Sequence, residues 1–200
     1  GPRRWGNAGA SRGASYVTIA ESGAEHPAEL RNMLVVPQLE GGYVIDGVGR
    51  ALASVRVITM IPLEAHLAYS MYFEPRSGGR LDAIALGRLG LAWRPVDEDE
   101  AHLRIGGSLR HWQDAQGARL GGEAFVGLDL FVEEPLVISL EGSIGIVGDA
   151  AMFEARGTLG IMMGPAELYA GWHHLAISPL DTRFAGVELT GPIAGLRLWL

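Results

Sequence analysis

Apolar and polar residues alternate along most of this chain, and the stretch from Leu136 to Met163 shows the pattern most clearly. Apolar side chains occupy every second position on either side of Gly148-Asp149, and the positions between them carry mainly Ser, Glu, Arg, Thr or Gly. Successive side chains of a β-strand point to opposite faces, so this spacing predicts two strands joined by a tight turn. One face of the hairpin is apolar and uncharged, and the other is polar and charged.

The same period of two runs from about Gln38 to Leu200, interrupted by short segments rich in Gly, Pro and Asp. These turns divide the chain into about ten strands, or eight if the weakest end segments are unpaired. The connections leave no room for crossover helices, so consecutive strands are expected to pair antiparallel. The predicted fold is all-β: a closed, antiparallel, up-and-down transmembrane β-barrel over residues 33–200.

The apolar positions change parity inside the last predicted strand. Val187 and Leu189 stand at odd positions, whereas Ala194, Leu196, Leu198 and Leu200 stand at even positions. A slip of one residue turns every side chain to the other face of a sheet. The sequence therefore predicts a β-bulge or a break near Gly191.

Residues 1–32 have a different composition, small and polar at first and then acidic. We expect an N-terminal arm with at most one short helix. The arm is either flexible or a docking segment for a protein partner, and the sequence leaves both open.

Alternation alone does not say which face of a barrel is inside. Two features of the polar face indicate that it lines the lumen. It is rich in glycine, which weakens a water-facing strand but leaves room beside large side chains in a narrow lumen. It also carries both signs of charge, and a buried ion must be paired. The predicted lumen network consists of Arg56, His66, Arg88, Arg104, Arg110, Glu123, Asp129, Glu141, Glu154, Arg156, Glu167 and Arg197. The glycines on the same polar face are Gly90, Gly106, Gly127, Gly145, Gly160 and Gly171.

Segments of about ten alternating residues are long enough to cross a bilayer when the strands tilt. Closure of the barrel leaves no unpaired backbone edge in lipid. Aromatic residues near strand ends are typical of the belts at the two membrane interfaces. The expected belt residues are Tyr72, Phe73, Trp93, Trp112, Phe131 and Trp199.

The composition narrows the classes of function. A net charge of −7 argues against a nucleic-acid partner, which requires a basic patch. The chain has no Cys, and all 16 basic residues are Arg, whose planar fork pairs well with buried carboxylates. The histidines and carboxylates lack the spacing of a metal site, so we expect neither a metal nor a cofactor.

The pattern over roughly residues 38–200 resembles the small outer-membrane β-barrels of bacteria, the class that includes OmpA-type and OmpW-type barrels. The segment Ala194–Leu200 is similar to the terminal strand of that class, although Trp199 stands one place before the end. The resemblance implies a bacterial outer-membrane location with lipid as the surrounding partner. It also implies periplasmic turns near Pro62, Asp97, Glu134 and Pro165, on the side of both termini.

Candidate catalytic groups are few. His173 and His174 are adjacent, so on a strand they point to opposite faces and cannot share one site without a bulge. The first hypothesis is therefore a non-enzymatic barrel with a structural, anchoring or assembly role. The alternatives are a narrow channel for ions or small solutes, a lipid-modifying or proteolytic membrane enzyme, and a soluble lipocalin-like carrier that binds a ligand among Leu103, Ile105, Leu128 and Ile144.

Overall fold

The computed structural model describes residues 33–45, 47–75, 81–98, 100–115, 117–180 and 186–200. The N-terminal arm predicted over residues 1–32 lies outside these ranges. The described chain forms ten strands: β1 (Met33–Val44), β2 (Val48–Thr59), β3 (Leu63–Pro75), β4 (Leu81–Asp97), β5 (Ala101–Asp114), β6 (Gly117–Glu133), β7 (Leu136–Val147), β8 (Ala150–Met163), β9 (Ala166–Pro179) and β10 (Val187–Leu198). Within the described ranges, no helix is long and apolar enough to span a membrane.

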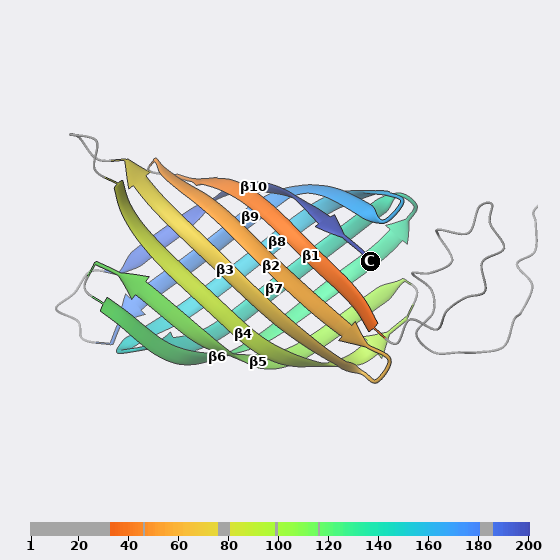
Figure 1. Cartoon of the computed structure of the whole chain (residues 1–200), viewed down its shortest axis with the longest axis horizontal. Coiled ribbons are helices and arrows are strands. Elements are labelled where there is room, and N and C mark those ends of the chain that lie inside the picture. Colours follow the sequence, from red (N-terminus) through yellow and green to blue (C-terminus); the bar gives the residue numbers. More distant parts are fainter. Residues whose placement is uncertain (1–32, 46, 76–80, 99, 116, 181–185) are drawn as a thin grey trace, which may run out of the picture.

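Each strand pairs antiparallel with the next, and β1 pairs with β10 to close a barrel of tilted strands (Figure 1). At the closing seam, the N–H of Val35 donates to the carbonyl of Leu200 at 2.9 Å, and the N–H of Leu200 donates back at 3.0 Å. The predicted all-β, closed, ten-stranded up-and-down barrel is confirmed. The turns after β2, β4, β6 and β8 lie at the end of the barrel that holds the C-terminus, which we call the terminus end. The opposite end is the loop end.

The apolar face of the strands points outward. Leu91, Leu109 and Ile144 are 69%, 66% and 69% exposed, although each stands in the middle part of its strand. Ile105 is exposed as well. This arrangement is the reverse of the one that a lipocalin-like carrier requires, in which these side chains would line an inner cavity.

The bulge predicted near Gly191 was wrong. β10 pairs with β9 in one continuous register from Val187 to Leu198. Leu189 and Ile193 point inward with Arg197 of the same strand, because the lumen near the loop end is itself apolar. The shifts of register that do occur lie near the terminus end, between Trp93 and Val96 in β4 and between Phe131 and Glu133 in β6.

The expected aromatic belt was also largely wrong. Trp93 is exposed on the outer wall, but Tyr72, Trp112 and Trp199 are buried in the lumen. They belong to two apolar clusters that close the two ends of the lumen. The loop-end cluster consists of Val44, Tyr72, Leu86, Trp112, Val147, Met152, Leu175, Ile177 and Leu189. The terminus-end cluster consists of Val36, Ile58 and Trp199, with Leu34, Phe131 and Met162 packed against them.

Candidate functional site

The charged lumen lies between the two apolar clusters. The structure places all twelve predicted network residues on the inner face, and most of them are buried. Alternation along each strand is sufficient to explain this, because one inward residue fixes the direction of every second neighbour. The inner arginines are Arg50, Arg56, Arg88, Arg94, Arg104, Arg110, Arg156 and Arg197. Their carboxylate partners, several of which are shared between two arginines, are Glu40, Glu64, Asp97, Glu123, Asp129, Glu141, Glu154 and Glu167.

Glu123 of β6 is a centre of the network, and its side chain is fully buried. It forms ion pairs with Arg88 of β4 and Arg110 of β5, the latter through Nε at 2.7 Å. The hydroxyls of Ser108 and Ser143 donate to its two oxygens at 2.5 and 3.0 Å. Four partners from three other strands therefore satisfy one carboxylate, as burial of a charge requires.

Glu40 of β1 is a second centre, nearer the closing seam. It pairs with Arg50, accepts two hydrogen bonds from Arg156 at 3.1 and 2.5 Å, and accepts one from the Tyr169 hydroxyl at 3.0 Å. Arg156 lies on β8 and Tyr169 on β9, so these contacts reach from β1 across the closing seam, past its neighbour β10, to the two strands before it. Glu40 therefore ties the seam together through side chains as well as through the backbone.

Other ion pairs extend across the lumen, and two of them join strands that are not neighbours. Arg56 of β2 donates to Asp129 of β6 at 3.0 Å. Arg104 of β5 donates to the same Asp129 at 3.1 Å and to Glu141 of β7 at 2.8 Å. Asp129 thus accepts from two arginines, and Arg104 donates to two carboxylates. Such shared pairs across the interior are expected of a small barrel that is filled by its own side chains.

Towards the terminus end, the network continues through Arg197, Glu167 and Trp199. Arg197 Nη1 donates to Glu167 at 3.0 Å, and the indole N–H of Trp199 donates to the same carboxylate at 3.2 Å. At the rim of that end, Asp97 accepts from Arg94 at 2.8 Å and contacts His102 Nδ1 at 2.8 Å. The charged network is thus joined directly to the terminus-end cluster through Trp199.

The sequence interpretation missed several members of the network: Glu40, Arg50, Glu64, Arg94, Asp97, Tyr169 and His173. Glu40 and Arg50 have the parity of the polar face, so the alternation itself is the signal that could have found them. The sequence predicts a turn near Asp97, whereas in the structure Asp97 is the last residue of β4, after a register shift. No periodic signal indicates such a shift.

The inner glycines make room for large neighbours, as the sequence indicated. A Cβ on Gly90 would collide with the ring of His66, and one on Gly127 with the guanidinium of Arg104. His66 also packs edge-on against Phe125, with 4.9 Å between the ring centroids. The small residues therefore allow the large ones to fit into a narrow interior.

Gly145 provides a test of this crowding. A Cβ there would lie within 3.0 Å of the Gly122 carbonyl and of the Glu123 backbone, which cannot move away freely. We expect Gly145→Ala to lower the free energy of unfolding by about 1–3 kcal/mol, the usual cost of overpacking. The control is Gly142→Ala on the outer face of the same strand, where the nearest heavy atom to a Cβ lies at 4.0 Å. Equal stability of the two variants in a urea titration would contradict a crowded lumen.

The two adjacent histidines point to opposite faces. His173 is buried in the lumen, where Nε2 lies 2.9 Å from Glu154. His174 lies on the outer wall, with Nδ1 3.6 Å from Glu188. Among the described residues, no group of three or more His, Asp or Glu side chains is arranged to hold a metal ion.

No protein-family model matches the sequence, and no curated protein matches it significantly. Among solved structures, the fold is similar to an anion-selective porin from Comamonas acidovorans, with a TM-score of 0.43 and 14% identity over 82% of this chain. The chain spans 59% of the length of that porin. It is also similar to the outer-membrane protease OmpT from Escherichia coli, with a TM-score of 0.44 and 8% identity over 88% of this chain and 99% of that one.

Proposed function

We propose that this protein is a non-enzymatic barrel of the bacterial outer membrane with a structural, anchoring or assembly role. The observation that carries the proposal is the orientation of the two faces: an exposed aliphatic wall encloses a charge-balanced interior. Large exposed apolar surfaces are unfavourable in water and favourable in lipid. A closed barrel also satisfies every strand edge, as the hydrocarbon region demands.

The proposal favours a sealed lumen over a channel for ions or small solutes. The loop-end cluster contains Trp112 and Met152, which are 5% and 2% exposed, and the terminus-end cluster contains Trp199 at 7%. The charges between them are engaged with one another, so the interior is filled by its own side chains. The role we propose therefore depends on the outer wall and the ends, with residues 1–32 as the segment available to a protein partner.

The test is to reconstitute the full chain into phospholipid vesicles and planar bilayers. We expect it to resist carbonate extraction, to migrate differently on a gel before and after boiling, and to give no steady conductance. A porin serves as the positive control for conductance. Solubility without detergent would contradict the membrane assignment, and reproducible single-channel steps would contradict the sealed lumen.

A further inference from the structure

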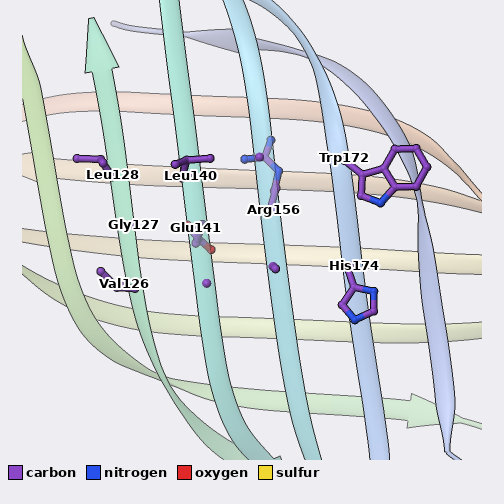
Figure 2. Close-up of a pocket in the computed structure, with 11 residues that line it drawn as sticks. Val126, Gly127, Leu128, Leu140, Glu141, Arg156, Trp172 and His174 are labelled. Carbon is purple, nitrogen blue, oxygen red and sulfur yellow. The ribbon is translucent and has the colours of Figure 1, made fainter.

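A shallow depression interrupts the outer wall over β6 to β9 (Figure 2). Its volume is about 470 Å³. Gly142, Ala155 and Gly157 line it with little or no side chain, while Leu140, Trp172 and His174 stand around them. The register brings these residues together, because Gly142 pairs with Ala155, and Gly157 pairs with both Leu140 and Trp172.

Crowding does not explain why small residues occupy this floor. A Cβ on Gly142 would meet its nearest heavy atom at 4.0 Å, and one on Gly157 would meet Leu140 Cδ2 at 3.3 Å. The inward Gly145 on the same strand differs, because there a Cβ would strike backbone atoms. The depression therefore exists because side chains that would largely fit are absent from the wall.

The edge of the depression towards the loop end is polar. The indole N–H of Trp172 donates to Thr190 Oγ1 at 3.0 Å. His174 lies two residues closer to the loop end on the same strand and pairs with Thr190 of β10. Its Nδ1 lies 3.6 Å from Oε1 of Glu188. An ionisable residue on a wall that faces lipid is unfavourable unless it has a polar partner. The depression thus has an apolar floor and one polar edge, which matches an amphiphile.

We propose that this depression binds one acyl chain of a membrane phospholipid, with the ester region of the lipid beside His174. The inference rests on the proposed membrane location. The site is continuous with the exposed aliphatic wall, so the surrounding lipid is already in contact with it. The volume falls in the range of about 300–1,000 Å³ that small-molecule sites occupy. The imidazole of His174 can donate a hydrogen bond to an ester carbonyl.

The experiment compares Gly142→Leu, which fills the floor, with Gly41→Leu as a matched control. Gly41 lies on the outer face of β1, where no heavy atom lies within 4 Å of an added Cβ. Each protein is reconstituted into nanodiscs of palmitoyl-oleoyl phosphatidylethanolamine and phosphatidylglycerol, and native mass spectrometry counts the phospholipids that remain bound after release. We expect the parent chain and Gly41→Leu to retain one lipid, and Gly142→Leu to retain at least tenfold less.

Equal retention by all three proteins would overturn the site. A dimer that Gly142→Leu alone abolishes would also overturn it, because the occupant would then be a second copy of this chain. If Gly142→Leu does not fold, Gly142→Ala replaces it, and retention is expected to fall in part. Failure of the parent chain to enter the nanodiscs would overturn the membrane location itself, which separates that outcome from failure of the lipid site.

Discussion

Replacing Glu123 by alanine is expected to lower the free energy of unfolding by about 3–5 kcal/mol. Removal of one partner from a buried ion pair leaves the other charge desolvated, and this costs more than the pair itself contributes. Here the change removes one of the two carboxylate partners of Arg88 and of Arg110, and it removes the acceptor of two serine hydroxyls. Arg88 and Arg110 keep their bonds to Glu141 and Glu154, so the barrel is weakened by a finite amount.

A urea titration of the protein in phospholipid vesicles measures this loss. Glu98→Ala is the control, since Glu98 is exposed in the turn after β4 and such substitutions usually change stability by less than about 0.5 kcal/mol. A loss below 1 kcal/mol for Glu123→Ala would contradict a network held by paired ions. Glu123→Gln is expected to fall between the parent and the alanine variant, because the amide keeps a hydrogen-bond acceptor but not the charge.

The second large effect concerns the outer wall. Leu140→Arg is expected to cost about 2–4 kcal/mol in a bilayer, the range for a cation on the lipid face near the midplane. Leu140 is 49% exposed and stands in the middle part of β7. The arginine would have neither a carboxylate partner nor water at that depth, in contrast to the inner Arg156 of the neighbouring β8, which pairs with Glu40.

Leu136→Arg is the matched control for Leu140→Arg. Leu136 is the first residue of the same strand and points to the same face, so its arginine can reach the interface. The cost there should be about 0–1 kcal/mol. The same vesicle titration serves for both variants. Equal costs at the two depths, or no cost at either, would remove the support for a wall in hydrocarbon.

The sequence by itself determined the strands, most turns and the two faces. A period of two assigns every residue of a strand to one side or the other, and the inner positions of the twelve network residues follow from it. The short connections then left antiparallel pairing as the only arrangement. The excess of glycine and balanced charge on one face was enough to indicate which face was inside.

The alternation could not reveal what the inner face carries near its ends. Leu189 and Ile193 share the inner side with Arg197, so apolar residues at inner positions looked like a change of register. Tyr72, Trp112 and Trp199 looked like belt residues, because nearness to a strand end is visible in sequence. Whether such residues face lipid or close the lumen depends on which neighbours they meet.

Only the tertiary structure decided which charges meet. Arg56 and Asp129 are 73 positions apart and lie on strands that are not neighbours. Their contact depends on the closure, tilt and diameter of the barrel, which are properties of all ten strands together. The depression on the outer wall has the same origin. Its floor is formed by residues of adjacent strands, and the register between those strands is not visible in the sequence of any one of them. Local alternation determines the face to which each side chain points, and only closure of the sheet determines which side chains come within contact distance of one another.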